Sequence, residues 1–157
     1  MRISILTAVA VTALLTACAH KEQQAAVGGG AEQATQQTQS LGLQDELKAA
    51  GDRIFFDFDK SDITAEARAT LERQAAFAQK HADLTFTIEG HCDERGTREY
   101  NLALGERRAT ADRNALTALG VSASRLKTIS YGKERPAVVG HNEAAWSQNR
   151  RAVLVIN

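Results

Sequence analysis

The chain opens with an uncharged, mostly apolar segment that is too short to cross a membrane. Residues 3–15 follow a single positive charge at Arg2. A membrane-spanning helix needs about 20 apolar residues, whereas the hydrophobic part of a secretory signal has roughly 7 to 15. The pattern therefore predicts a signal peptide over residues 1–17.

The end of this segment, Leu15-Thr16-Ala17-Cys18, resembles the lipobox of bacterial lipoproteins. The thiol of Cys18 would receive diacylglycerol, and stable anchoring needs more than one acyl chain. An ordinary signal peptide with a chance cysteine is the alternative. Residue 19 is alanine and not the aspartate that resembles an inner-membrane retention signal. We therefore expect lipid anchoring to the cell outer membrane, with the rest of the chain facing the periplasm.

The segment that follows has no hydrophobic periodicity. Residues 19–43 contain six glutamines, three consecutive glycines and no aromatic residue. Such a sequence cannot bury enough apolar surface to compensate for the entropy lost on ordering. We interpret residues 18–43 as a lipidated, flexible tether and residues 44–157 as a folded domain.

Within the domain, the hydrophobic pattern alternates between the periods of strands and of helices. Alternating apolar and polar positions predict four strands, at 53–58, 84–90, 126–131 and 151–156. Apolar positions three or four apart predict helices at 43–50, 64–81, 101–119 and 143–148. The order β-α-β-α-β-(α)-β favours an α/β domain of the α+β sandwich type, in which helices cover one face of a mixed sheet.

Composition then excludes several classes of protein. The 157 residues include 19 Lys plus Arg and 19 Asp plus Glu, so the formal net charge is zero. This balance argues against nucleic-acid binding, which needs a basic surface. Two cysteines, Cys18 and Cys92, exclude a disulfide framework and a four-thiolate metal site. The sequence carries no nucleotide or hydrolase fingerprint, and we expect no cofactor.

Charged residues gather in two loops, at 58–62 and 91–98, which follow the first two predicted strands. Ligands of alternating strand and helix units tend to bind beyond the carboxyl ends of the strands. A charged loop is more often only solvated surface, so these loops alone do not define a site.

The second long helix strengthens the prediction of a ligand site at these loops, because Arg108 lies on its apolar stripe whereas Arg107 lies to one side. A guanidinium that faces the core must be paired. The nearest candidate partners are loop carboxylates, chiefly Asp93 and Asp59. Two interpretations stay open: a structural ion pair, or an arginine and an aspartate that each bind one end of a zwitterion.

Four segments resemble the OmpA-like domain family: FDFDKSDI at 56–63, EGHCDERGTREYNLALGERRA at 89–109, YGKERP at 131–136 and NRRAV at 149–153. The similarity covers nearly all of residues 52–157. It implies an OmpA-like fold that binds the diaminopimelate of peptidoglycan stem peptides without covalent chemistry. With the lipobox, it also implies that the chain links the outer membrane to the cell wall and contacts the Tol system, notably periplasmic TolB.

The resemblance also implies roles for individual residues. Asp93 matches the acceptor of the ligand's ammonium group, and Arg108 matches the fork that binds its carboxylate. The remaining matches form or support the pocket wall: Phe58, Asp59, Asn101 and Leu104. An arginine fork grips a carboxylate with two parallel hydrogen bonds, and a short aspartate on a turn is a well-placed acceptor, so the chemistry suits a zwitterion.

Two other functions compete with this interpretation. A cell-wall hydrolase would use Cys92 as its nucleophile and needs a histidine beside the thiolate. Cys92 continues the inward parity of the strand, whereas His91 points to the opposite face, so a buried, inert thiol is favoured. No second His or Cys follows at metal-ligand spacing. The other rival is a structural lipoprotein that binds only protein partners. The inward position of Arg108 counts against it but leaves it open.

Overall fold

The computed structural model describes residues 41–157. The predicted signal peptide, Cys18 and nearly all of the predicted tether lie outside the described residues. Residues 41–50 form a helix, at the place of the predicted lead-in helix, and its Leu47 packs into the core. None of the helices in 41–157 is long and apolar enough to cross a membrane.

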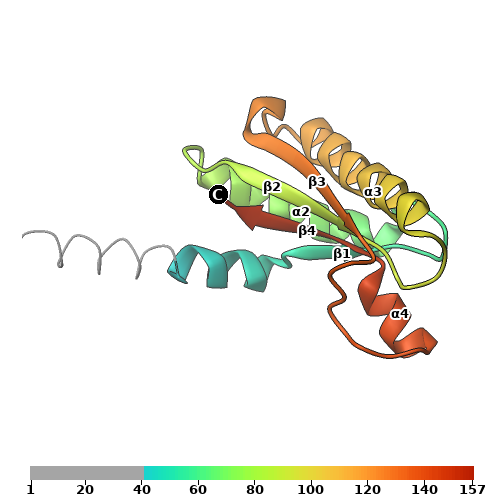
Figure 1. Cartoon of the computed structure of the whole chain (residues 1–157). Coiled ribbons are helices and arrows are strands. Elements are labelled where there is room, and N and C mark those ends of the chain that lie inside the picture. The colour runs from blue at the N-terminus through green and yellow to red at the C-terminus, as the bar shows by residue number, and fades with distance from the viewer. Residues whose placement is uncertain (1–40) are drawn as a thin grey trace, which may run out of the picture.

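Four strands form one mixed sheet (Figure 1). They are β1 (Arg53–Phe55), β2 (Phe86–His91), β3 (Leu126–Gly132) and β4 (Arg151–Ile156), in the spatial order β1-β4-β2-β3. Strand β4 is antiparallel to β1 and β2, and β2 is parallel to β3. Strands β1, β2 and β3 therefore run in one direction, and the loops that follow them emerge at the same end of the sheet.

The helices α2 (Ala65–Lys80), α3 (Arg98–Ala118) and α4 (Glu143–Asn149) follow β1, β2 and β3 in turn. Helix α2 begins where predicted, because the Thr64 hydroxyl accepts a hydrogen bond from the Ala67 N–H at 3.1 Å. Helix α3 begins three residues earlier than predicted, because Thr97 caps it in the same way. The earlier start places Asn101 in the first turn of α3.

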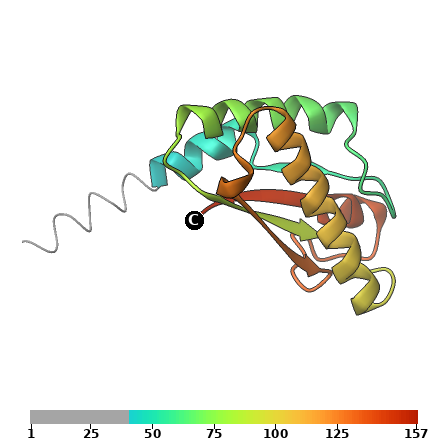
Figure 2. The ribbon, with the colours of Figure 1, turned by 90° about the horizontal axis from the view of Figure 1, so that it is seen from above.

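Helices α2 and α3 pack on the same face of the sheet (Figure 2). The core between the helices and the sheet is built from alternate residues of the strands and from the inward stripe of each helix: Ile54, Leu71, Ala78, Phe86, Ile88, Ala109, Leu116 and Leu154. The opposite face of the sheet leaves Phe55 and Ile129 exposed. The predicted α+β sandwich with a mixed sheet is confirmed.

Strand β1 is shorter than predicted, and its early end shapes the site. The prediction of a strand over 53–58 is wrong for its last three residues, because the chain turns at 57–60. The turn is closed by a hydrogen bond from the Lys60 N–H to the Asp57 carbonyl at 3.2 Å, and Asp59 has a φ of 59°. Phe58 therefore leaves the plane of the sheet and is 56% exposed.

Two glycines bring α3 into backbone contact with the sheet. A Cβ atom on Gly90 would lie 1.8 Å from the carbonyl oxygen of Gly105, and one on Gly105 would lie 2.3 Å from the Ser130 Oγ. A larger residue at Gly90 would force the helix to move, and one at Gly105 would displace the Ser130 side chain. This close approach sets the side chain of Arg108, three residues beyond Gly105, over the end of β2.

Candidate ligand-binding site

A cavity of about 150 Å³ lies at the end of the sheet where β1 and β2 finish. All six residues predicted for the ligand site line it: Phe58, Asp59, Asp93, Asn101, Leu104 and Arg108. Cys92, Arg95, Gly96 and Tyr100 complete the lining. The structure therefore brings together side chains from two loops and one helix that the sequence separates by up to 50 residues.

Arg108 is completely buried, at 0% exposure. Its guanidinium donates hydrogen bonds to three backbone carbonyls, those of Lys60 at 2.8 Å, His91 at 2.8 Å and Asp57 at 3.1 Å. The prediction that loop carboxylates, chiefly Asp93 and Asp59, would be its direct partners is wrong. The reason is that carbonyls at the end of a strand and in the adjoining turn lack sheet partners and need a donor.

This arrangement holds a positive charge in the cavity wall without a carboxylate in direct contact. Burial lowers the pKa of Arg108, but a guanidinium stays protonated in proteins. Three of its five N–H groups donate to the carbonyls, and the other two make no hydrogen bond within residues 41–157. Arg108 can therefore bind a carboxylate that enters the cavity.

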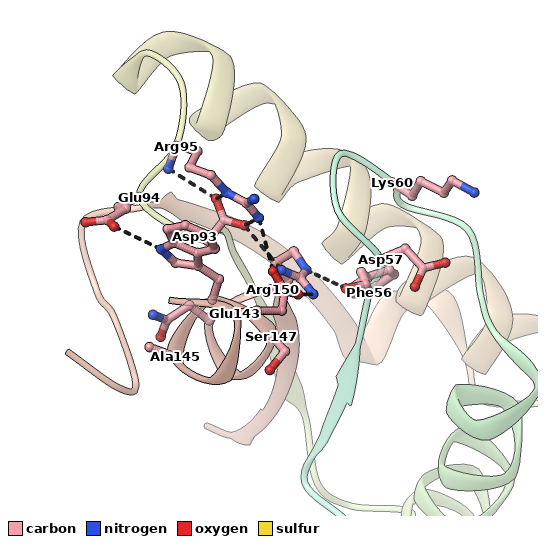
Figure 3. A network of polar contacts seen from close by, with 12 residues as sticks. Phe56, Asp57, Lys60, Asp93, Glu94, Arg95, Glu143, Ala145, Ser147 and Arg150 are labelled. Carbon is pink, nitrogen blue, oxygen red and sulfur yellow. Dashed lines mark hydrogen bonds and ion pairs between the residues drawn. The ribbon is translucent and has the colours of Figure 1, made fainter. Parts of the chain in front are cut away.

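Asp93 lies on the loop after β2 and is almost completely buried (Figure 3). Its Oδ2 accepts from the Arg95 Nη2 at 2.6 Å, and its Oδ1 accepts from the Arg95 Nε and backbone N–H at 3.2 and 3.1 Å. Burial alone would raise the pKa of Asp93, but the hydrogen bonds from Arg95, helped by Arg150, hold it below its ordinary value. Asp93 is therefore an anion at neutral pH.

Arg150 joins three parts of the site (Figure 3). Its Nε donates to the Phe56 carbonyl at 2.9 Å, its Nη2 donates to Glu143 of α4 at 2.6 Å, and its Nη1 lies 3.5 Å from the Asp93 Oδ2. It thereby ties the end of β1 to the loop after β2. Sequence reasoning missed this role, although Arg150 belongs to the NRRAV segment that carried the family resemblance.

Arg95 was also missed as a member of the site. Its guanidinium carbon lies 3.9 Å from the centre of the Phe58 ring and 4.1 Å from the centre of the Trp146 ring. Contacts of this kind between a cation and aromatic faces contribute about 0.5 to 1 kcal/mol each at exposed sites. The indole N–H of Trp146 donates in turn to the Glu94 carboxylate at 2.9 Å.

The predicted Asp59 pairs with a residue other than Arg108. The phenol O–H of Tyr100 donates to the Asp59 carboxylate, and this hydrogen bond raises the pKa of Tyr100. Sequence reasoning missed Tyr100 because the predicted helix began after it. The two residues close one side of the cavity, where the turn after β1 meets the first turn of α3.

Asn101 and Gly96 shape the loop that carries Asp93. The Asn101 amide donates to the carbonyls of Arg95 at 2.8 Å and Thr97 at 3.0 Å. Gly96 has a φ of 91°, a conformation that favours glycine, and it allows the tight turn of this loop. Leu104 is buried and forms an apolar part of the wall.

The geometry around Cys92 does not assemble a nucleophile. Its buried thiol donates to the Asn101 carbonyl at 3.3 Å, and burial raises the pKa of Cys92. The ring of His91 instead stacks on Tyr131, with centroids 5.6 Å apart, and burial lowers the pKa of His91 to about 4. Among residues 41–157, no three His, Cys, Asp or Glu side chains are grouped to hold a metal ion.

Comparison with known proteins places this fold and site in a family. The OmpA family model matches residues 55–150. This match includes both charged loops, the whole of α3 and the Arg150 that supports Asp93. The chain therefore belongs to the OmpA family, as predicted.

Within that family the chain is similar to peptidoglycan-associated lipoproteins. It is 50% identical to the one from Rhizobium meliloti over 97% of this chain and 86% of the relative. It is 46% identical to the one from Haemophilus influenzae over 96% of this chain and 95% of the relative.

Solved structures show the same fold. The crystal structure of the peptidoglycan-associated lipoprotein from Burkholderia pseudomallei is 45% identical and has a TM-score of 0.66, with 69% of this chain and 92% of that chain covered. The C-terminal domain of Helicobacter pylori MotB has a TM-score of 0.63 at 21% identity, over 68% of this chain and 84% of that domain. At that identity the likeness to MotB shows the fold alone.

Proposed function

We propose that this chain is an outer-membrane lipoprotein that binds the diaminopimelate of peptidoglycan stem peptides and so links the outer membrane to the cell wall. One observation carries the proposal. A buried arginine held only by carbonyls, Arg108, and an ionised aspartate, Asp93, line the same cavity. The names of the relatives, peptidoglycan-associated lipoproteins, support the same conclusion.

The chemistry of diaminopimelate suits this pair of charges. The end of its side chain carries an ammonium and a carboxylate on one carbon atom. The carboxylate takes the free N–H groups of Arg108, and the ammonium takes an oxygen of Asp93. Lysine, which ends in an ammonium alone, leaves Arg108 without a partner. The interaction is binding without covalent change, because Cys92 is a protonated, buried thiol.

The family resemblance extends the proposal to partners. We assign the chain to the Tol system, with TolB as a periplasmic partner and with roles in envelope integrity and cell division. The lipid anchor at Cys18 belongs to the same proposal. Replacing Cys18 with Ala should release the protein from membrane pellets into the soluble periplasmic fraction. Unchanged pelleting after digestion of the cell wall would contradict lipid anchoring.

A sedimentation assay with purified peptidoglycan tests the binding function. The chain should sediment with peptidoglycan that contains diaminopimelate, and free meso-diaminopimelate should release it. Peptidoglycan with lysine at the same position is the matched control and should retain much less protein. Equal retention by the two kinds of wall, or no effect of the free ligand, would reject the proposal.

A further inference from the structure

Both oxygens of the Asp93 carboxylate are already engaged by Arg95. A carboxylate offers about four acceptor positions. Arg95 uses three of them through its Nη2, its Nε and its backbone N–H, and the Nη1 of Arg150 lies 3.5 Å from Oδ2. Because Asp93 is 4% exposed and Arg95 engages both of its oxygens, an incoming ammonium group gains access to the carboxylate when one of these side chains moves away.

The two arginines differ in how firmly they are held. The side chain of Arg150 is 8% exposed, and two further hydrogen bonds fix it to Phe56 and Glu143. The side chain of Arg95 is 31% exposed and is held by Asp93 and by the faces of Phe58 and Trp146. Displacing Arg95 returns a guanidinium to water at the cavity rim, whereas displacing Arg150 would leave buried acceptors unpaired. Arg95 is therefore the donor that moves.

A second acceptor lies within reach of Arg95. The Oε2 of Glu143 is 3.9 Å from the Arg95 Nη2, at an exposed side chain of α4. The guanidinium can turn toward this carboxylate and keep a partner of opposite charge when it leaves Asp93.

We propose that Arg95 is an internal competitor for Asp93, which the ammonium group of the ligand displaces, so that Arg95 sets the affinity of the site. The inference rests on the proposed function, because it takes the ligand to be a zwitterion. While Arg95 covers Asp93, the site cannot bind the ammonium group. The apparent Kd therefore equals the intrinsic Kd divided by the fraction of molecules whose Asp93 is free. Removing the guanidinium should thus strengthen binding.

The test is a titration of meso-diaminopimelate into the purified chain and two variants. Arg95→Gln removes the competitor, and Arg98→Gln is the control. Arg98 lies near Arg95, has a side chain that is 67% exposed and makes only an exposed contact with Glu134 at 3.4 Å. Arg95→Gln should bind on the order of 10-fold more tightly, and Arg98→Gln should bind like the parent. Thermal melting confirms that each protein is folded.

A second measurement uses the parent protein. Trp146 is the one tryptophan of the chain and stacks on Arg95. Its fluorescence should therefore change as the ligand saturates the site. This test needs only the parent protein, so it holds even if Arg95→Gln fails to fold. Equal or weaker binding by folded Arg95→Gln, or no change in Trp146 emission at saturation, would overturn the inference alone. Absence of binding by parent and variants would overturn the proposed function and this inference with it.

Discussion

Two buried ionisable side chains one helical turn apart on α3, Arg108 and Asp112, have very different surroundings. Arg108 and Asp112 are both 0% exposed. Arg108 donates to three carbonyls. Neither carboxylate oxygen of Asp112 has a hydrogen-bond partner within residues 41–157, and burial raises the pKa of Asp112 to about 7. A buried charge is tolerated where partners surround it, whereas a buried carboxyl without partners is driven toward its neutral form.

The contrast separates function from stability. Arg108 lies at the cavity, where loop carbonyls need a donor and a ligand carboxylate needs a cation. Asp112 lies beyond the cavity lining and holds no partner that would be left unpaired by its removal. Substitution of the two residues should therefore change stability in opposite directions.

Replacing Arg108 with methionine should have the largest effect. The substitution leaves three carbonyls unpaired in a buried setting, and each buried acceptor that loses its donor typically costs about 1 to 3 kcal/mol. Arg108→Lys should lose less stability, because its ammonium keeps the charge. It should still lose some, because one ammonium cannot reach all three carbonyls. Urea unfolding measures both, with Arg107→Met as the control. Equal stability of Arg108→Met and the parent would contradict the stabilising role assigned to Arg108.

Replacing Asp112 with alanine should stabilise the protein at neutral pH. The variant removes a buried polar group without partners, whose burial costs about 1 to 3 kcal/mol in proteins, and alanine favours the helix. The gain appears as a higher urea midpoint with an unchanged slope. Diaminopimelate affinity should not change. A loss of stability would show that Asp112 has a stabilising role that the structure does not reveal.

The stability of the protein should depend on pH through two buried groups, Asp112 and His91. The pKa of folded Asp112 is raised from 3.8 to about 7, so its contribution is present at low pH and is lost as the pH rises through this range. The pKa of folded His91 is lowered from 6.5 to about 4, so its contribution is present above pH 6.5 and is lost as the pH falls. The two effects oppose each other over the same interval.

In a variant without Asp112, the pH dependence of stability that comes from His91 should therefore no longer be offset. Between pH 6.5 and pH 5.5 the stability of Asp112→Ala should fall by about 1 kcal/mol relative to the parent. The parent gains stability over this interval from the proton that only its folded Asp112 binds, and such a proton changes stability by up to about 1.4 kcal/mol per pH unit. Urea midpoints of both proteins across this interval measure the difference. Parallel profiles for the two proteins would contradict the assigned protonation states.

Replacing Cys92 with alanine should have the smallest effect. The thiol is a weak donor in a packed position, so we expect a stability cost of about 1 kcal/mol and binding within a few-fold of the parent. Calorimetry measures the stability, sedimentation with peptidoglycan measures the binding, and a cell-wall digestion assay tests for hydrolysis. Release of wall fragments by the parent but not by the variant would favour the hydrolase instead.

The sequence predicted most of the fold because its periods are clear. Helix α2 has both a cap at Thr64 and an inward stripe, and the strand period of β2 persists to its end. Strand β1 was predicted too long, because the alternation of Phe56 and Phe58 continues after the sheet hydrogen bonds stop. Sequence periodicity records which side chains are apolar, but it does not record where a backbone carbonyl finds its donor.

The candidate site was predicted in part for the same reason. The inward position of Arg108 follows from helical spacing, and Asp93 follows from its place after a strand. The direct partners of Arg108 are carbonyls, whose directions depend on turns that the sequence does not specify. Arg95, Trp146 and Arg150 meet around Asp93 only after folding brings α4 beside the loop after β2.

The central claim, that Asp93 and Arg108 clamp a zwitterion, is tested most directly by calorimetric titration of meso-diaminopimelate into the parent and Asp93→Asn. Asparagine keeps the shape of Asp93 and removes the charge. The matched control ligand, 1,5-diaminopentane, keeps both ammonium groups and lacks both carboxylates. The account predicts that the parent binds diaminopimelate and not the diamine, and that folded Asp93→Asn binds diaminopimelate at least about 30-fold more weakly. Equal affinity of parent and folded Asp93→Asn for diaminopimelate, or equal affinity of the parent for the two ligands, would contradict it.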